Sequence, residues 1–401
     1  MCSSDLVSAT APSSPPTVTA TNGVGAVAKA TYNLVADSSA PTGGALTVNA
    51  VAASAAGTSS FNKTGSYTIG TRTDYATDAG SGLASSVLTR AIAPLANNVC
   101  GTYAAPVTIT GSPAQSGLAA DCYLYKLTGT DNVGNSASLS ETVKVDATAP
   151  APTLSVPVDA NGAVAVTFAA TDAGSGVNAA SGQLKRATAT YTPATDTCGA
   201  YGAFANVGAA GPSSPFSDTT VATGHCYEYE YTVSDAAGNS ATSAVHAVKV
   251  NTTKPALTGI VDTTAGTTAG LPQVGDAVTL QFNDPIAAAS IPSSVTLTYA
   301  RSGLTSTTVT VSALGLGAWG TGDSLISRYS NTGGTSAIVT ATTLLSGTTV
   351  KLTVSAVSDP SKNLTAGGPG AVSGTVNAAV KDVFGNTAST TAFTTSSIRL
   401  F

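Results

Sequence analysis

Charged and aromatic residues are scarce in this chain of 401 residues. Charged side chains make up 9% of it, against about 25% in typical soluble domains, and aromatic side chains make up 5%. The formal net charge of −5 excludes the basic footprint that nucleic-acid-binding proteins need. No apolar run reaches the length of about eighteen residues that a membrane helix requires, so the sequence predicts no membrane span in this stretch.

Glutamate and helical patterns are also nearly missing. The 21 acidic residues comprise 18 aspartates and 3 glutamates. Glutamate favours helices, whereas aspartate favours turns and metal-binding loops, and no amphipathic helix stands out. Together with 41 glycines, this composition predicts short strands joined by tight turns, and therefore an all-β fold.

Histidine is limited to His225 and His246, which leaves little material for catalysis. His225 precedes a cysteine and His246 lies within a strand-like run, so we interpret both as structural. Glu228 and Glu230 share one face of a strand, unlike the carboxylates of glycoside hydrolases, which face each other across a cleft. No glycine-rich phosphate loop opens a helix. The sequence therefore predicts that the chain is not an enzyme.

What the chain does contain is a repeated hairpin pattern, clearest between Cys226 and Pro255. Apolar side chains alternate there at period two, which places them on one face of a strand: Tyr227, Tyr229, Tyr231 and Val233. A turn follows at Asp235–Asn239, where Gly238 can adopt a positive φ and the aspartate can accept hydrogen bonds from the backbone that follows. A second alternating run, Val245–Val250, completes an antiparallel hairpin.

The hairpin recurs along the chain. Cys122–Pro150 has the same Cys-Tyr-x-Tyr start, the same Asp-x-x-Gly-Asn turn and the same valine-rich exit. Thr17–Pro41 is a third copy, in which Asn22 and Ala26 replace the aspartate and asparagine of the turn. Asp382–Asn386 is a fourth, weaker copy of the turn alone.

The repeat divides the chain into domains. Three copies end in a proline, at intervals of about one hundred residues that indicate repeated domains rather than solenoid units: Pro41, Pro150 and Pro255. We expect residues 7–37 to be the C-terminal fragment of a truncated repeat, 38–146 and 147–251 to be complete domains, and 252–401 to be a longer, divergent domain. Residues 1–6, MCSSDL, match what the end of a common sequencing-library adapter would encode, and we interpret them as an artefact; the alternative is a genuine, disordered start of the chain.

Four of the five cysteines form two matched sets, one in each complete domain. Each set has a Cys-Gly-x-Tyr segment and a later Cys-Tyr pair: Cys100 with Cys122, and Cys198 with Cys226. The same two places in both domains predict one disulfide per domain and an oxidising compartment. A zinc site is the alternative, although the sequence lacks Cys-x-x-Cys spacing and a histidine placed to complete the set of zinc ligands.

These motifs together resemble the bacterial Ig-like repeats of large secreted and cell-surface proteins, including adhesins. The likeness covers residues 38–251 and rests on the hairpin, the linker after it, and an Asp-x-Gly-Ser-Gly loop at Asp78–Gly82 and Asp172–Gly176. The resemblance implies tandem immunoglobulin-like, Greek-key β-sandwiches in a linear array and an extracellular or cell-surface location. Neither repeat contains a tryptophan, so the disulfide-against-tryptophan core of antibody domains is not expected.

The last segment, 252–401, resembles a second bacterial Ig-like family. Its Gly275–Pro285 stretch has the Gly-Asp-x-Val-x-Leu-x-Phe opening of that family, which occurs in surface-layer and adhesive proteins. The segment contains no cysteine. Its Gly/Thr/Ser-rich stretches at 313–347 and 361–376 are expected to form long loops or extra hairpins.

Aspartates mark the predicted domain junctions. In an Ig-like sandwich the incoming linker, the loop after the second strand and the last hairpin turn lie at one end, and each domain has an acidic or amide residue at all three places: Asp37, Asp78 and Asp131; Asp146, Asp172 and Asp235; Asn251, Asp284 and Asp382. Calcium prefers such oxygen ligands. The resemblance therefore predicts interdomain calcium, bound more weakly beside the neutral Asn251. The alternative is ordinary turn chemistry, which also favours aspartate.

The predicted function is mechanical. The resemblance implies a non-catalytic structural or adhesive stalk that spaces and presents a distal functional domain, with an unidentified protein or glycan on a surface as its partner. The alternative is an accessory region of a secreted hydrolase whose catalytic domain lies outside this stretch. A carbohydrate-binding module is a third interpretation, which would require rows of exposed aromatic residues.

Overall fold

The computed structural model describes residues 6–8, 10, 13–32, 34–263, 273–302, 306–311, 314, 316–320, 337–357 and 373–394. Residues 1–5 of the suspected adapter segment lie outside these ranges, as does much of the two predicted long loops, 313–347 and 361–376.

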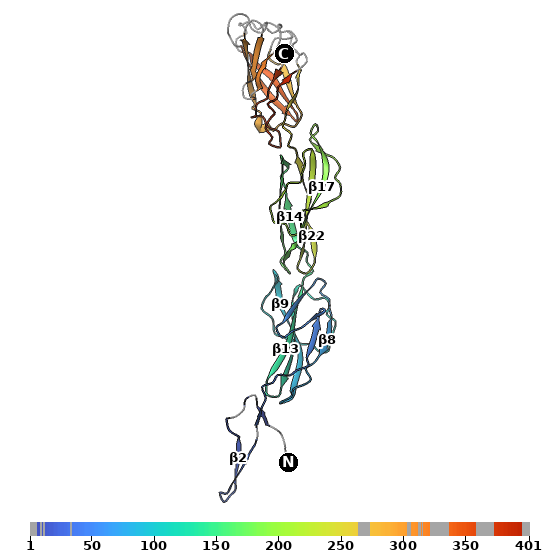
Figure 1. Cartoon of the computed structure of the whole chain (residues 1–401), viewed down its shortest axis with the longest axis vertical. Coiled ribbons are helices and arrows are strands. Elements are labelled where there is room, and N and C mark those ends of the chain that lie inside the picture. The colour runs from blue at the N-terminus through green and yellow to red at the C-terminus, as the bar shows by residue number, and fades with distance from the viewer. Residues whose placement is uncertain are drawn as a thin grey trace.

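Strand-rich segments follow one another end to end in a long rod (Figure 1). The described residues form β-strands and one short 3₁₀ turn, η1 (Ala288–Ser290), and none of them forms an α-helix. The fold is therefore all-β, a linear array of immunoglobulin-like sandwiches, and the prediction of fold class is confirmed. Within the described ranges, no helix has the length and apolarity to cross a membrane.

The N-terminal tail contains two small strand pairs. Strands β2 (Thr17–Thr21) and β3 (Val27–Thr31) form an antiparallel hairpin, and every residue of both strands is exposed. Asn22 closes the turn, because its Oδ1 accepts hydrogen bonds from the backbone N–H groups two and four residues later, at 3.1 and 2.9 Å. Strand β1 (Leu6–Ser8) pairs in parallel with β4 (Leu34–Ala36). A hairpin that buries so little gains little stability from packing.

The first repeat, β5 to β13, is a sandwich of two sheets. One sheet has the order β6-β5-β8, and the other has the order β10-β9-β12-β13-β7 with β11 beside β9. The strands are β5 (Ala45–Val48), β6 (Val51–Ala52), β7 (Thr58–Asn62), β8 (Ile69–Thr73), β9 (Leu83–Ala96), β10 (Val99–Cys100), β11 (Val107–Thr108), β12 (Asp121–Asp131) and β13 (Ser136–Val145). Leu88, Tyr125 and Leu127 are fully buried between the sheets.

The second repeat, β14 to β23, has the same plan. Its sheets have the orders β14-β16-β20 and β15-β23-β21-β17-β18, with β19 beside β17 and β22 beside β21. The strands are β14 (Ala151–Ser155), β15 (Asp159–Ala160), β16 (Val164–Thr171), β17 (Val177–Thr192), β18 (Thr197–Cys198), β19 (Ala205–Val207), β20 (Phe216–Asp218), β21 (His225–Asp235), β22 (Ser240–Thr242) and β23 (His246–Val250). The predicted alternation in β21 is present, because Tyr227, Tyr229, Tyr231 and Val233 are all buried.

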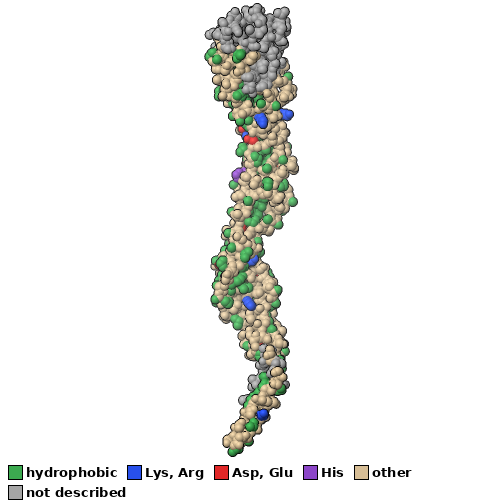
Figure 2. All heavy atoms as spheres, turned by 90° about the vertical axis from the view of Figure 1, so that its left-hand side faces the viewer, with side chains coloured by type: hydrophobic (Ala, Val, Ile, Leu, Met, Phe, Trp, Pro, Cys, Tyr) green, Lys and Arg blue, Asp and Glu red, His purple; other side chains and the backbone are tan. Residues whose placement is uncertain are grey.

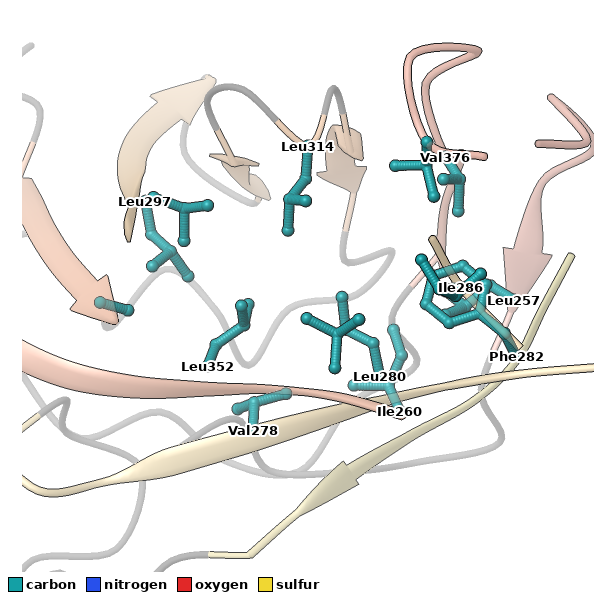
Figure 3. Close-up of a cluster of buried hydrophobic side chains, with 14 of the residues drawn as sticks. Leu257, Ile260, Val278, Leu280, Phe282, Ile286, Leu297, Leu314, Leu352 and Val376 are labelled. Atoms are coloured by element: carbon teal, nitrogen blue, oxygen red, sulfur yellow. The ribbon is translucent and has the colours of Figure 1, made fainter. Parts of the chain in front are cut away.

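The third domain, β24 to β32, joins its strands in a single path instead of two sheets. The order is β24-β25-β30-β29-β26-β27-β28-β31-β32, and β32 returns to contact β24. The strands are β24 (Leu257–Asp262), β25 (Ala277–Phe282), β26 (Ser294–Ser302), β27 (Ser306–Val311), β28 (Leu316–Gly320), β29 (Ala337–Ser346), β30 (Thr349–Val357), β31 (Ser373–Gly374) and β32 (Phe393–Thr394). A sheet that curls back on itself encloses one core, in which Leu280, Leu297 and Leu352 lie buried (Figure 3).

Both complete repeats contain the disulfide that their sequence predicts. Cys100 in β10 bonds to Cys122 in β12, and Cys198 in β18 bonds to Cys226 in β21, each with Cα atoms 5.8 Å apart. Each bond ties the tip of a long hairpin, β9-β10 or β17-β18, to the start of the next strand in the sheet. The disulfides therefore fix the hairpin tips that face the following domain.

The surface carries little charge. On the face in Figure 2, uncharged polar groups and backbone dominate, with single apolar side chains scattered between them. The most exposed apolar residues, such as Val24 and Val158, are spread over different segments of the rod. Isolated exposed apolar residues are normal on soluble domains.

Candidate metal centres at the domain junctions

Two of the predicted aspartate sets converge in the structure. We call the sets the tail junction (Asp37, Asp78 and Asp131), the central junction (Asp146, Asp172 and Asp235) and the distal junction (Asn251, Asp284 and Asp382). At the tail junction and at the central junction, each aspartate offers one carboxylate oxygen, and the three oxygens lie within 4.8 Å of one another. In each of these sets the linker aspartate and the turn aspartate are buried, and the loop aspartate is half-buried.

The Asp-x-x-Gly-Asn turn closes with the same backbone bond in all three domains, in which the N–H of the aspartate donates to the carbonyl oxygen of the asparagine. In the first repeat, Asp131 Oδ1 accepts hydrogen bonds from the backbone N–H groups of Val133 at 3.0 Å and Asn135 at 2.8 Å. Gly134 adopts a φ of 97°, which an L side chain would oppose. These bonds hold the aspartate carboxylate in the turn and leave part of it facing the junction.

The last residue of this turn ties the turn to the linker. The side-chain amide nitrogen of the asparagine donates to the carbonyl oxygen of the linker residue in every case: Asn135 to Asp37 at 2.9 Å, Asn239 to Asp146 at 2.9 Å and Asn386 to Asn251 at 2.8 Å. The same amide nitrogen also donates to the aspartate of its own turn. The asparagine therefore sets the distance between linker and turn, a role that the sequence analysis did not assign to it.

The linker aspartates accept hydrogen bonds from the neighbouring loop. Asp37 Oδ2 accepts from the backbone N–H of Ser81 at 2.6 Å, and Oδ1 accepts from that of Ser39 at 3.0 Å. These bonds lower the pKa of the Asp37 carboxyl, the bond from Ser81 most of all. Asp146 Oδ2 accepts from the N–H of Ser175 at 2.6 Å in the same geometry.

A glycine in each loop makes room for the linker carboxylate. A Cβ atom on Gly80 would lie 2.4 Å from Asp37 Oδ2, and a Cβ atom on Gly174 would lie 2.4 Å from Asp146 Oδ2. Real Cβ atoms do not approach that closely, so any larger residue would displace the carboxylate. The middle glycine of the Asp-x-Gly-Ser-Gly motif is therefore part of both candidate centres.

The loop aspartate of the tail junction retains a carboxylate oxygen without a protein partner. Among the described residues, Asp78 Oδ1 has no hydrogen-bond partner although the atom is buried. Burial raises the pKa of Asp172, and the negative charges of Asp146 and Asp235 raise it further. Carboxylates held this close repel one another unless a proton or a cation lies between them. Both centres thus have the oxygen ligands, charge and spacing that suit a hard divalent cation.

The distal junction differs in charge and in burial. Asp284 and Asp382 are 2% and 0% exposed, while the linker position holds the neutral Asn251. Burial raises the pKa of both carboxyls, and the charge of Asp382 raises that of Asp284 further. Asp284 Oδ2 has no hydrogen-bond partner among the described residues. With two carboxylates in place of three, this junction offers a cation less charge than the others do.

The residues weighed for catalysis lie apart from these centres. His246 is exposed on β23, and His225 is half-buried with its Nδ1 3.0 Å from the carbonyl oxygen of Thr223. Glu230 forms an ion pair with Lys185 at 3.3 Å on the outer face of the sheet. The structure does not bring these groups together with the aspartates of a junction.

No protein-family model matches this chain, and no curated protein sequence matches it. Among solved structures, the chain is similar to a tetra-tandem repeat in the extending region of a large adhesion protein, with 18% identity, a TM-score of 0.32, and coverage of 96% of this chain and 80% of that one. It is also similar to part of a 1.5-MDa bacterial ice-binding adhesin, with 14% identity, a TM-score of 0.27, and coverage of 74% and 93%. The FN1–FN3 domains of chicken CNTN1 show 11% identity, a TM-score of 0.24, and coverage of 84% and 98%.

Proposed function

We propose that this chain is a stalk region of a secreted or surface-anchored bacterial protein, in which calcium stiffens the joints between Ig-like domains. The stalk carries out no catalysis; it spaces and presents a functional domain located elsewhere in the protein. The end-to-end arrangement of the sandwiches supports the spacing role (Figure 1). The two disulfides support an oxidising location outside the cytoplasm.

One observation carries the proposal: each aspartate set joins a linker to the domain that follows it. The backbone N–H of Asp146 donates to the carbonyl oxygen of Asn62 in the first repeat at 2.9 Å. The carboxylate of Asp146 lies with those of Asp172 and Asp235 in the second repeat. A cation bound by all three carboxylates would hold the first repeat and the second in one orientation.

The convergence of three carboxylates fits calcium binding better than it fits turn chemistry alone. Turn chemistry explains the bonds that Asp131 and Asp235 make inside their own turns. It does not explain why a third carboxylate from a separate loop lies within 4.8 Å, or why Asp78 Oδ1 has no partner. Calcium takes about six to eight oxygen ligands, so the three carboxylates would be completed by carbonyl groups and water.

Native mass spectrometry of the intact chain, with calcium and with a chelator, tests the proposal. We expect two calcium ions per chain, one at the tail junction and one at the central junction. A calcium concentration about 100 times the Kd should stabilise each occupied junction by about 2.7 kcal/mol. Small-angle scattering should show a greater maximum dimension and a narrower distribution of radii of gyration with calcium, because fixed joints keep the rod straight.

Matched variants locate the ions. Asp172→Asn keeps the shape of the side chain and removes one charge, so it should reduce the stoichiometry from two to one. Asp74→Asn is the control, since Asp74 is an exposed aspartate that pairs with Arg72 at 3.0 Å and lies outside both sets. If calcium changes neither mass, melting nor dimensions of the wild-type chain, the aspartates are turn residues and the proposal fails.

A further inference from the structure

The distal junction reverses the hydrogen bond that joins linker and loop. At the tail and central junctions, the linker carboxylate accepts this bond from a backbone N–H, that of Ser81 or Ser175, at 2.6 Å. At the distal junction, Asn251 Nδ2 donates to Asp284 Oδ1 at 2.7 Å. An N–H group therefore points at the loop carboxylate where the other junctions present oxygen.

The orientation of the Asn251 amide is fixed by its other contacts. Its Oδ1 accepts from the backbone N–H of Thr253 at 2.9 Å and from Thr223 Oγ1 at 3.1 Å. A flipped amide would turn its NH₂ group toward the N–H of Thr253, where two donors would meet. The nitrogen must therefore face Asp284, and its hydrogens occupy the side from which a cation would bind.

An aromatic contact between the third domain and the second repeat closes the same junction. Phe384 is the third residue of the Asp-x-x-Gly-Asn turn, where the first and second repeats have Val133 and Ala237. Its ring meets that of Tyr191, at the end of β17, edge to face with centroids 5.4 Å apart. Phe384 is 6% exposed and packs with Ala189, Tyr191 and Cys226 of the second repeat in one apolar cluster. Such pairs contribute about 0.5–1.5 kcal/mol beyond the area that they bury.

A lysine adds a fixed positive charge at this contact. Lys249 Nζ lies 5.8 Å from the ring centre of Phe384 and 6.0 Å from that of Tyr191. Two carboxylates of the second repeat hold the ammonium group, that of Asp196 at 2.8 Å and that of Asp159 at 3.1 Å. The distal junction thus contains a cation of the protein itself, placed over both rings.

The central junction has no equivalent apolar cluster among the described residues. Its domains meet through polar contacts: Asn97 and Asn98, at the β9-β10 tip, donate their backbone N–H groups to the carbonyl oxygens of Ala173 and Gly174, each at 2.9 Å. An open cavity of about 450 Å³ borders Asn97, Asn98 and Asp172. Water can therefore enter the central junction, where it competes for the polar contacts.

We propose that the distal junction is a calcium-independent joint, closed by the Asn251–Asp284 hydrogen bond and by the packing of Phe384 against Tyr191. The contrast with the other two junctions rests on the proposed function. The chain then contains two kinds of joint: the tail and central junctions stiffen when calcium binds, whereas the second repeat and the third domain stay together without it.

Distance measurements by electron spin resonance on the full chain test this inference. One pair of spin labels, at Val107 and Val158, spans the central junction, and another pair, at Val158 and Leu344, spans the distal junction; all three residues are more than 60% exposed. Cys2 is replaced by serine so that the labels attach only at the chosen sites. With a chelator, the Val158–Leu344 distribution should keep its width, while the Val107–Val158 distribution should broaden and should narrow again when calcium is added.

Two variants make the result specific. Phe384→Ala should broaden the Val158–Leu344 distribution with or without calcium, and the exposed neighbouring residue provides the control, Val383→Ala. Asn251→Asp should supply a third carboxylate and raise the number of calcium ions per chain by one in native mass spectrometry.

The outcomes separate this inference from the proposed function. A Val158–Leu344 distribution that broadens in chelator and narrows with calcium would overturn the inference, and so would a third calcium ion on the wild-type chain. Phe384→Ala with an unchanged distribution would also overturn it. If calcium does not change the Val107–Val158 distribution while the Val158–Leu344 distribution stays narrow, the proposed function fails at the central junction and the calcium-independent distal joint is supported.

Discussion

Arg186 donates from Nη1 to Asp218 Oδ2 over 2.6 Å inside the second repeat, and the hydroxyl of Tyr229 donates to the same oxygen at 2.8 Å. The first repeat has a neutral version of this contact, in which Arg90 Nη1 donates to Gln115 Oε1 at 2.7 Å and the hydroxyl of Tyr125 donates to the same oxygen at 3.0 Å. The two repeats therefore bury the same arginine-tyrosine arrangement around a carboxylate in one case and an amide in the other.

Asp218→Asn should destabilise the second repeat, because the Arg186 guanidinium loses its charged partner in a half-buried place. Hydrogen bonds to charged groups contribute about 1.5–3 kcal/mol, and we expect a loss in that range. Calorimetry of the full chain should show a lower melting temperature for the transition of the second repeat. The control is Gln115→Asn, which shortens the neutral acceptor in the first repeat and should leave the transition of the second repeat unchanged.

The same carboxylate should make the second repeat sensitive to acid. Burial alone would raise the pKa of Asp218, but hydrogen bonds from Thr220 and Tyr229 and the charge of Arg186 outweigh it and lower the pKa. Its stabilising contribution is thus complete above the unfolded pKa of about 3.9 and is lost as the pH falls through the lower folded value. Melting curves between about pH 2 and pH 6 should show this loss in wild type and a flatter profile in Asp218→Asn. Equal profiles would contradict the assignment.

Glu141 should give the stability of the first repeat the opposite dependence on pH. It is 0% exposed, and neither carboxylate oxygen forms a hydrogen bond of good geometry with the described residues. Burial raises its pKa, and the nearby hydroxyls of Thr58 and Ser60 offset only part of that rise. A raised folded pKa means that stability is highest below the unfolded value of about 4.3 and falls as the pH rises from there to the folded pKa. Glu141→Gln should therefore raise the melting temperature at pH 7 and leave it nearly unchanged at pH 4. A variant that melts lower than wild type at pH 7 would show that the buried charge is compensated.

Gly174→Ala should abolish calcium binding at the central junction without removing a ligand. The new Cβ would lie 2.4 Å from Asp146 Oδ2, so the linker carboxylate must move away from Asp172 and Asp235. Gly162→Ala is the matched control, because no atom lies within 4 Å of its added Cβ. Isothermal titration with calcium should show one site fewer for the first variant only. Two intact sites in Gly174→Ala would mean that the carboxylate does not take part.

Replacing the Cys198–Cys226 disulfide by two serines should lower the stability of the second repeat. The bond closes a segment with a sequence separation of 28 residues, and loops of this size are stabilised by about 3–4 kcal/mol in the chain-entropy treatment. The Cys100–Cys122 pair, with a separation of 22 residues, should give a slightly smaller loss. Calorimetry of the two double variants checks the order, and a transition unaffected by either pair would contradict the stabilising role.

Features that repeat within the chain could be predicted from its sequence. Tyr125 and Tyr229 occupy the same place in two copies of one motif, and alternation at period two assigns both to the core. The convergence of the aspartates could be predicted because three short motifs recur in the same order in both repeats. The likeness of this order to that of Ig-like domains places the aspartates at one end of each domain. A motif that occurs twice with the same spacing indicates a structural role that one copy alone would not indicate.

Features that occur once could not be predicted in this way. Phe384 contacts Tyr191 across nearly two hundred residues of chain, and its turn position holds smaller side chains in the other copies. Gln115 and Asp218 lie in segments without a shared motif, so nothing in the sequence pairs them with an arginine. The single curled sheet of the third domain depends on which strands become neighbours, and strand propensity alone does not decide neighbours.

We expect the parallel pairing near the end of each repeat to affect how the chain responds to tension. In the first repeat, Thr58–Asn62 of β7 lies parallel to Glu141–Val145 of β13, the last strand. Once tension reaches β7, it would pull the two strands past each other along their length, so that the hydrogen bonds of this patch would bear the force together instead of opening one by one. In the second repeat the corresponding patch is shorter, with Asp159–Ala160 of β15 beside Lys249–Val250 of β23. Under a slowly rising load the second repeat should therefore extend before the first. Its disulfide would then shield the chain between Cys198 and Cys226 from extension and limit how far that repeat can lengthen.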